Sequence, residues 1–382
     1  MRIGHYMNGL RHAGGVASYI RRISAAQRQA GHEVALFDRA PRGGAVTHRF
    51  GDDVQTRSDA HLIQRVSDME LDILHLHTVV DPDLTTAVPM LRTVHGHWSY
   101  CPSGSQFLGR SSKACPRCYG IVGCTWGHFI DRCGSVRPTK FLDDFSRARL
   151  ERRHHAKVRA VAISDFVRDR MIRSGLDGSL IDVLLSPAPT PSPATSVPHD
   201  DPPRFVFLGR LVPEKGAEWL LRAFAQVRTQ ATLDVCGIGP QQQQLEELSR
   251  RLGLGSRVCF HGWVDEPRAF ALIEAARAVV FPSLWHEPAG LVTLEAAAHG
   301  RAVIASRVGG IPQYAQMLGN AVLVEPNDVA GLAVEIQRLA DDPALAETLG
   351  QVGREAAARD FDLKRHLEGL DRCSQRAGAT CR

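Results

Sequence analysis

The chain has 382 residues, of which 44% are hydrophobic and 23% charged. This length exceeds what one hydrophobic core usually organises, and the composition excludes a disordered chain, so we expect two folded domains. No apolar stretch reaches the roughly 18 residues of a membrane-spanning helix, and the N-terminus lacks the apolar segment of a secretory signal. We therefore expect a cytoplasmic protein.

Basic and acidic residues are unevenly distributed along the chain. Residues 1–190 hold 26 Lys and Arg against 18 Asp and Glu, and the remaining residues hold 20 against 23. The basic first half suits a phosphorylated or acidic partner or an anionic membrane surface, but an arginine-rich solvated surface explains it equally well. The net charge of +5 is too small to indicate a nucleic-acid partner.

Short β-rich runs alternate with helical patterns on both sides of a proline-rich segment, as in parallel α/β sheets. Before this segment, Gly14-Gly15 forms a turn that opens a helix, and we expect strands at residues 2–6, 34–37, 73–77, 91–95 and 159–163. After it we expect strands at residues 204–208, 232–236, 258–260, 278–281 and 302–305. The predicted fold class is α/β, with two doubly wound domains whose strand ends face a ligand cleft.

The proline-rich segment sets the domain boundaries that we predict. The N-terminal Rossmann-like domain spans residues 1–186 and carries a cysteine-rich insertion at about 98–135. A linker of residues 187–203 leads to the second Rossmann-like domain, residues 204–361, because prolines without donors favour an extended connector. We expect residues 362–382 to form a helix that returns toward the first domain.

The most informative segment runs from Phe281 to Ala296 and contains a strand end, a loop and a helix that starts near Gly290. The free amides of the first helical turn offer a site for a phosphate, and Glu287 and Glu295 flank that turn. One carboxylate can bind sugar hydroxyls and the other ribose hydroxyls, on opposite sides of the phosphates. By themselves, two such glutamates are equally explained as a helix-start charge and a solvated face.

Two cations make the interpretation more specific. Arg210 and Lys215 follow the first strand of the second domain, each beside a glycine turn. At this edge of the sheet they can neutralise a diphosphate leaving group, on which negative charge grows as the glycosidic bond breaks.

These residues resemble the signature of the retaining glycosyltransferases with the two-domain GT-B architecture, specifically glycosyltransferase family 4. Arg210 and Lys215 match its Gly-Arg-Leu-x-x-x-Lys-Gly motif. Glu287 and Glu295 match its two glutamates separated by seven residues. The resemblance implies two Rossmann-like domains that face each other across a cleft.

The resemblance extends over about residues 204–361 and more loosely into the first half, at Gly14-Gly15 and His95. It implies that Arg210 and Lys215 bind the donor diphosphate. It also implies that Glu295 binds the ribose and that Glu287 holds the donor sugar, which His95 approaches from the opposite domain. The implied donor site further includes phosphate-side amides and nucleobase-side loops, with Gly14, Gly15, Gly237, Trp263, Val264, Gly290, Leu291 and Val292.

Two positions depart from the family pattern. Ala289 stands where a large apolar residue is usual, which leaves extra room beside the donor sugar, and Gln313 stands where glutamate is usual. The resemblance further implies front-face attack with retention of configuration. We assign no carboxylate as nucleophile, and the chemistry needs no divalent metal if Arg210 and Lys215 supply the positive charge.

We therefore expect a transferase of polysaccharide biosynthesis that uses a UDP- or GDP-sugar, with a glycan, lipid-linked or small-molecule acceptor in the first domain. A nucleotide-sugar epimerase of the same architecture is the alternative enzyme, because fold analogy alone does not separate the two. A zinc-bearing binding module on a degenerate scaffold is the non-enzymatic alternative, and the intact cations and glutamates count against it.

Five of the nine cysteines lie close together in the predicted insertion. Cys115-x2-Cys118 is a good chelate, and we expect one structural zinc ion with four ligands taken from Cys101, Cys115, Cys118, Cys124, Cys133 and His128. Five cysteines for four places leave the choice open, and local disulfides or free buried thiols are the alternatives. We expect the insertion to lie beside the acceptor entrance.

A basic run that we expect to be helical follows the insertion. Such a run is usually a solvated face, but it can also contact lipid-linked acceptors or anionic headgroups. It comprises Arg147, Arg149, Arg152, Arg153, His154, His155, Lys157 and Arg159.

Overall fold

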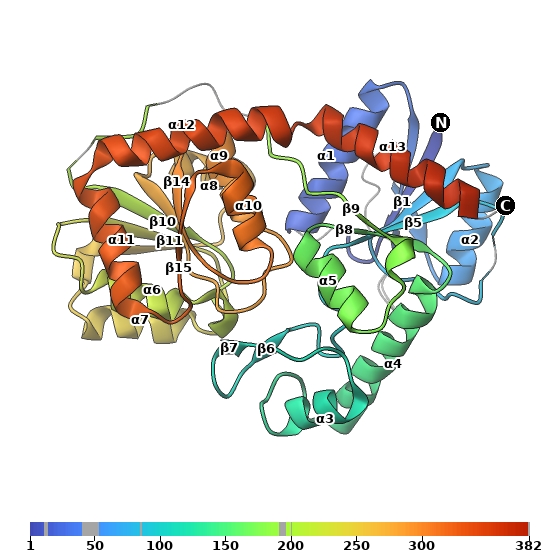
Figure 1. Ribbon diagram of the computed structural model, residues 1–382, viewed down its shortest axis with the longest axis horizontal. Coiled ribbons are helices and arrows are strands. Elements are labelled where there is room, and N and C mark those ends of the chain that lie inside the picture. Colours follow the sequence, from blue (N-terminus) through green and yellow to red (C-terminus); the bar gives the residue numbers. More distant parts are fainter. Residues whose placement is uncertain (11–13, 40–52, 85, 191–195, 200, 381–382) are drawn as a thin grey trace.

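The computed structural model describes residues 1–10, 14–39, 53–84, 86–190, 196–199 and 201–380. It contains two α/β domains side by side, each built on a parallel sheet, which confirms the predicted fold class (Figure 1). Residues 191–195 and 200 of the predicted linker lie outside the described residues. Within the described ranges, no helix combines the length and apolar content needed to cross a bilayer.

The N-terminal domain holds seven parallel strands in the order β3-β2-β1-β4-β5-β8-β9. The strands are β1 (Arg2–Met7), β2 (Glu33–Arg39), β3 (Asp53–Thr56), β4 (Ile73–Leu76), β5 (Met90–Val94), β8 (Arg159–Ala162) and β9 (Ile181–Val183). The helices of this domain are α1 (Gly15–Gln29), α2 (Asp59–Asp68), α4 (Pro138–His155), α5 (Asp165–Arg173) and the short 3-10 helix η1 (Gly178–Leu180).

The C-terminal domain holds six parallel strands in the order β12-β11-β10-β13-β14-β15. The strands are β10 (Arg204–Leu208), β11 (Thr232–Cys236), β12 (Val258–Gly262), β13 (Ala278–Phe281), β14 (Ala302–Ser306) and β15 (Ala321–Val324). The helices are α6 (Ala217–Phe224), α7 (Gln242–Arg251), α8 (Glu266–Glu274), α9 (Leu291–Ala298), α10 (Ile311–Leu318), α11 (Val329–Asp341) and α12 (Pro343–Asp360), with the 3-10 helices η2 (Pro213–Lys215) and η3 (Gly255–Arg257).

Helices on both faces bury the central strands of this second sheet. In β10, Phe205 and Phe207 pack into one apolar layer, and Val206 packs into the layer on the opposite face. Parallel strands buried on both faces are therefore apolar at successive positions, which is the pattern seen in the sequence. The rigid sheet holds the loops at its carboxyl edge in place.

The last helix, α13 (Leu363–Thr380), leaves the C-terminal domain and lies along the N-terminal domain beside α1 (Figure 1). Tyr19 of α1 donates a hydrogen bond of 2.8 Å to His366 Nε2. His366 Nδ1 in turn donates to Leu185 O at 2.9 Å. This helix thus joins the two domains a second time.

Polar contacts between the domains fix the carboxyl edges of the two sheets relative to each other. Tyr314 O–H donates to Ile163 O at 2.7 Å and accepts from Ser186 N at 3.0 Å. Ser164 Oγ donates to Pro288 O at 2.6 Å. These contacts join the end of β8 to α10 and to the loop before α9.

The cysteine-rich insertion, residues 98–135, reaches from the N-terminal domain to the C-terminal domain (Figure 1). Phe107 packs into the core of the C-terminal domain, and Asn327 Nδ2 donates to Ser112 O at 3.2 Å. The elements of the insertion are the antiparallel strands β6 (Phe107–Leu108) and β7 (Lys113–Ala114) and the helix α3 (Ile121–Phe129).

Candidate active site

A cleft of about 720 Å³ lies between the domains, at the carboxyl ends of both sheets, where open α/β sheets usually bind ligands. The predicted site residues that line it are Gly14, Gly15, His95, Arg210, Lys215, Gly237, Trp263, Val264, Leu291 and Glu295. Glu287, Gly290 and Val292 are not part of this lining. Most of the predicted site residues are thus brought together from both domains.

Two helices begin on opposite walls of the cleft, α1 at Gly15 and α9 at Leu291. Glycine occupies both N-cap positions, Gly14 and Gly290, so no capping side chain covers the first amides. A Cβ atom at Gly15 would lie 3.6 Å from Leu291 Cδ1, which places the two first turns next to each other. Amides at helix N-termini carry positive partial charge, so this pair of ends suits a diphosphate.

The two predicted cations lie on the C-terminal wall. The side chain of Arg210 is 66% exposed and lies 3.7 Å from Glu214. Lys215 Nζ lies 2.7 Å from Glu287 Oε1, which also accepts a hydrogen bond of 2.6 Å from Ser283 Oγ. Glu287 is therefore buried in a fixed orientation behind Lys215, and the guanidinium of Arg210 remains exposed to the cleft.

Glu295 lies near two charged residues, Arg22 and Glu266, that the sequence motifs did not include. Burial raises the pKa of Glu295 to about 7, an effect that Arg22 opposes and Glu266 reinforces. Burial also lowers the pKa of Arg22, whose buried Nε makes no hydrogen bond within the described part of the chain. Arg22 could have been found from its helical spacing, because Gly15, Ser18 and Arg22 share the face of α1 that lines the cleft.

Three histidines form a chain of contacts that ends at the cleft. His95 Nε2 lies 3.0 Å from His77 Nδ1, and His77 Nε2 lies 3.2 Å from His5 Nδ1. His5 Nε2 lies 2.8 Å from Gln27 Oε1. Burial lowers the pKa of His95 to about 3 and that of His5 to about 4, so both rings are neutral at pH 7.

The direction of this chain sets the tautomer of His95. With Gln27 Oε1 as the final acceptor, each ring donates through Nε2 and accepts at Nδ1. His95 is thereby left with Nδ1 as a hydrogen-bond acceptor. His75 lies beside this row of histidines. One nitrogen from each of His5, His75 and His77 lies within 4.8 Å of the others.

The loops that we predict on the nucleobase side lie at the ends of β11 and β12. Gly237 has a φ of 138°, and a Cβ atom there would lie 1.9 Å from Gly209 O, so only glycine fits. Trp263 is 61% exposed and lines the cleft with Val264. An exposed indole offers an apolar face on which a base can stack.

The two positions that depart from the family pattern have different explanations. Gln313 Oε1 accepts from Asp165 N at 2.8 Å, and its Nε2 donates to Asp165 Oδ2 at 2.5 Å. Glutamate would place a second carboxylate against Asp165, so this contact requires the amide. Ala289 is 4% exposed and packs in the apolar cluster between the domains. Ala289 is not among the residues that line the cleft, and the extra room beside the donor sugar stays a prediction.

One cavity of about 20 Å³ is lined by His128 and by all five cysteines of the insertion, Cys101, Cys115, Cys118, Cys124 and Cys133. All five are free thiols, and Cys118 is exposed. The sequence thus correctly grouped the cysteines in space, and zinc binding stays a prediction. The insertion contacts the loop that carries Glu287, and its expected place beside the acceptor entrance stays a prediction.

The predicted basic run forms the second half of α4 and the start of β8, and much of it is engaged within the domain. Arg152 Nη1 donates to Ser174 O at 2.6 Å, and Arg153 forms an ion pair with Asp83. Both histidines of the run are buried. These contacts explain the run without a membrane surface, and contact with lipid stays a prediction.

Comparison with known proteins assigns the C-terminal domain to a family. Residues 192–356 match the family described as Glycosyl transferases group 1. The chain is 26% identical to a glycogen synthase of Mycobacterium tuberculosis over 393 residues, which cover 91% of this chain and 88% of the other. It is 40% identical over 159 residues to LpsD of Rhizobium meliloti, a lipopolysaccharide core biosynthesis glycosyltransferase, covering 42% of this chain and 45% of that protein.

Solved structures share the fold over the whole chain. A sucrose-phosphate synthase from Thermosynechococcus elongatus matches with a TM-score of 0.73 and 22% identity, over 99% of each chain. Anabaena HepE, solved in complex with UDP-glucose, matches with a TM-score of 0.67 and 18% identity, over 97% of this chain and 99% of that one. These matches confirm the predicted GT-B arrangement.

Proposed function

We propose that this chain, which is a group 1 glycosyltransferase with the GT-B fold, transfers a sugar with retention of configuration from a UDP- or GDP-sugar. Within that group we place it in glycosyltransferase family 4, and we place the acceptor against the N-terminal domain. The observation that carries the proposal is the cleft, where two helix N-termini, several cations and the carboxylate of Glu295 surround space for a nucleotide sugar.

The diphosphate of the donor is assigned to the region between the two helix N-termini. The amides at Gly15 and Leu291 lie on opposite walls, and Arg210 and Lys215 lie beside them. Arg22 adds a third cation from the N-terminal domain. These positive groups stabilise charge that develops on the leaving diphosphate, so the proposed chemistry does not require a divalent metal.

The two glutamates are assigned to different parts of the donor. Glu295 is proposed to accept hydrogen bonds from the ribose hydroxyls, since its carboxylate lines the cleft inside α9. Glu287 is proposed to bind the donor sugar, because Lys215 and Ser283 hold its carboxylate rigidly. His95 contributes a neutral acceptor from the opposite wall, positioned by His77.

The retaining step is proposed to use the leaving diphosphate itself. As the bond from the sugar to the diphosphate breaks, Arg210 and Lys215 stabilise the departing oxygen, and the acceptor hydroxyl attacks from the same face. No protein carboxylate is assigned as a nucleophile. A glycan, a lipid-linked sugar or a small molecule remains the predicted acceptor, and the complex of HepE with UDP-glucose supports a nucleotide-sugar donor by fold likeness.

Purified protein can be incubated with a panel of UDP- and GDP-sugars, with and without mixed glycan and lipid-linked acceptors. We expect release of nucleoside diphosphate that depends on the acceptor and a product with the donor's anomeric configuration. An Arg210→Ala variant serves as the matched control because the side chain is exposed and its loss should leave the fold intact. Formation of an isomeric nucleotide sugar without acceptor would instead establish the epimerase alternative.

A further inference from the structure

The five thiols of the cysteine-rich insertion differ in how far the fold buries them. Cys101 and Cys115 are buried and Cys124 and Cys133 are half-buried around the small cavity, whereas Cys118 is exposed. The segments that carry these four thiols therefore meet around one cavity.

The cavity leaves room for a bound ion among the four sulfurs. Its volume of about 20 Å³ exceeds the roughly 10–15 Å³ that a water molecule needs, so a single metal ion fits. Among common divalent ions, four thiolates in a tetrahedral arrangement are typical of zinc.

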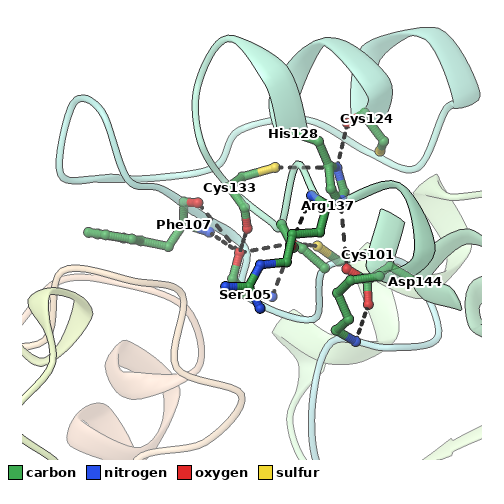
Figure 2. A network of polar contacts seen from close by, with 11 residues as sticks. Cys101, Ser105, Phe107, Cys124, His128, Cys133, Arg137 and Asp144 are labelled. Carbon is green, nitrogen blue, oxygen red and sulfur yellow. Dashed lines mark hydrogen bonds and ion pairs between the residues drawn. The ribbon is translucent and has the colours of Figure 1, made fainter. Parts of the chain in front are cut away.

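The surroundings of the cavity hold two of the four cysteines in place (Figure 2). His128 Nδ1 donates to Cys124 O at 2.8 Å and lies 3.9 Å from Cys133 Sγ. His128 Nε2 lies 3.7 Å from Asp144 Oδ2. A Cβ atom at Gly127 would lie 2.9 Å from Cys133 Sγ, so helix α3 packs directly against this thiol. His128 therefore orients ligands, as outer residues of metal sites commonly do, and is not itself one of the four.

We propose that Cys101, Cys115, Cys124 and Cys133 bind one Zn²⁺, and that this site makes the insertion a brace for the donor loop, residues 282–290. A Zn–S distance of about 2.3 Å sets sulfur–sulfur separations of about 3.8 Å in a tetrahedron. In the described part of the chain, no three of these sulfurs all lie within 4.8 Å of one another. Binding therefore draws at least some of the cysteine-bearing segments closer together.

The brace acts through hydrogen bonds that flank two of the proposed ligands. Cys115 O accepts from His286 Nε2 at 3.1 Å, and His286 immediately precedes Glu287. His286 O accepts from His97 Nε2 at 2.6 Å, and His97 Nδ1 accepts from the hydroxyl of Tyr100, which adjoins Cys101, at 2.5 Å. The side chain of His286 is thus held by the insertion, and its carbonyl is held by His97, just before the insertion. The effect on the donor sugar rests on the proposed function, which assigns that sugar to Glu287.

The metal site is tested by elemental analysis of the full chain purified with a reductant and without added metal. We expect about one zinc per chain, retained in Cys118→Ser and lost in Cys124→Ser and Cys133→Ser. Where a variant does not fold, the cobalt-substituted native chain gives a second measurement, since four thiolates produce intense thiolate-to-cobalt charge-transfer bands. Absence of zinc, iron with acid-labile sulfide, disulfides on peptide mapping, or loss of zinc in Cys118→Ser would each overturn the site.

The brace is tested by hydrogen exchange of the native chain before and after removal of zinc with a chelator. We expect amides of residues 284–287 to exchange at least about tenfold faster without zinc, while amides of β14 are unchanged, and we expect added zinc to restore protection. Unchanged exchange in the donor loop would overturn the brace and leave the metal site standing. Neither measurement depends on catalysis, so a failure here is distinct from a failure of the proposed transferase activity.

Discussion

Replacement of Glu295 by glutamine should show separately how much this carboxylate destabilises the folded chain and how much it contributes to ligand binding. Burial raises the pKa of Glu295 from 4.5 to about 7. Between these values the folded chain keeps a proton that the unfolded chain has lost, so the free energy of unfolding falls as pH rises through this interval. At about 1.4 kcal/mol per pH unit, the full shift corresponds to roughly 3 kcal/mol. Glu295 is half-buried, so solvent screening makes this an upper bound.

We therefore expect Glu295→Gln to be more stable than the native chain at pH 8 and equally stable near pH 4.5. For a domain of this size, each kcal/mol moves the melting temperature by about 2–4 °C, so the increase at pH 8 should be several degrees. Thermal unfolding between pH 4.5 and 8.5 measures the effect. Glu247→Gln, an exposed position on α7, is the matched control and should show no such pH dependence.

Binding should change in the opposite direction. Loss of a charged acceptor for the ribose hydroxyls costs about 1.5–3 kcal/mol, which is roughly a tenfold to hundredfold loss of affinity at pH 8. Native affinity should fall as pH drops below 7 and Glu295 is protonated, and the glutamine variant should lose this dependence. Calorimetry should use UDP-glucose or GDP-mannose, because the terminal phosphate of a free nucleotide itself titrates near pH 6. A variant that is less stable at pH 8, or that keeps the native pH dependence of binding, would refute the reasoning.

Three further substitutions test the remaining assignments. Glu287→Ala should spare the free nucleotide but weaken the nucleotide sugar, and it should lower stability by about 1–3 kcal/mol because Lys215 loses its partner; equal losses for both ligands in calorimetry would contradict the division of roles. Arg210→Ala should lower kcat more than donor affinity, because charge on the diphosphate grows in the transition state; steady-state kinetics with an unchanged kcat would reduce it to a binding residue. Gln313→Glu should destabilise the chain by about 1–3 kcal/mol through repulsion by Asp165, and Asp165→Asn in the same chain should restore much of the melting temperature; an unchanged melting temperature in the single variant would contradict the contact.

The sequence predicted the inner strands of both parallel sheets and the edge strand β12, and it missed the other three edge strands and the β6–β7 hairpin of the insertion. The missed edge strands are β3, β9 and β15, each at the end of its sheet order. An edge strand is covered by fewer neighbours, so its residues need not be apolar: β3 reads Asp-Val-Gln-Thr, and most of β15 is only half-buried. The inner strands are buried on both faces, and their short apolar runs are therefore visible in the sequence.

The sequence predicted those parts of the candidate site whose residues lie close together along the chain. Arg210 and Lys215, like Glu287 and Glu295, lie close in sequence, so local spacing sufficed to place them at one edge of the sheet. Helical spacing places Arg22 on the face of α1 that carries Gly15, but Arg22 reaches the cleft from the other domain and no local pattern pairs it with Glu295. Its position depends on how the two domains face each other.

The histidine chain required the strand order. His5 belongs to β1, His77 follows β4 and His95 follows β5, and these three strands are adjacent in the sheet. Once the order β1-β4-β5 is known, the carboxyl ends of the strands place the three rings side by side. The local sequence around His95 therefore could not show that two histidines lie behind it.

The cysteines show that spacing in the sequence does not predict which thiols the fold buries. Cys115-x2-Cys118 is the pair that spacing favours as a chelate, yet the fold buries Cys115 and leaves Cys118 exposed. Cys101 precedes the β6–β7 hairpin, and Cys124 and Cys133 lie in and just after α3, so their convergence on Cys115 depends on how that helix packs against the hairpin. Close packing at Gly127 and the contacts of His128 supply that arrangement. A set of four ligands is therefore a property of the folded insertion, and the sequence could group the candidates without choosing among them.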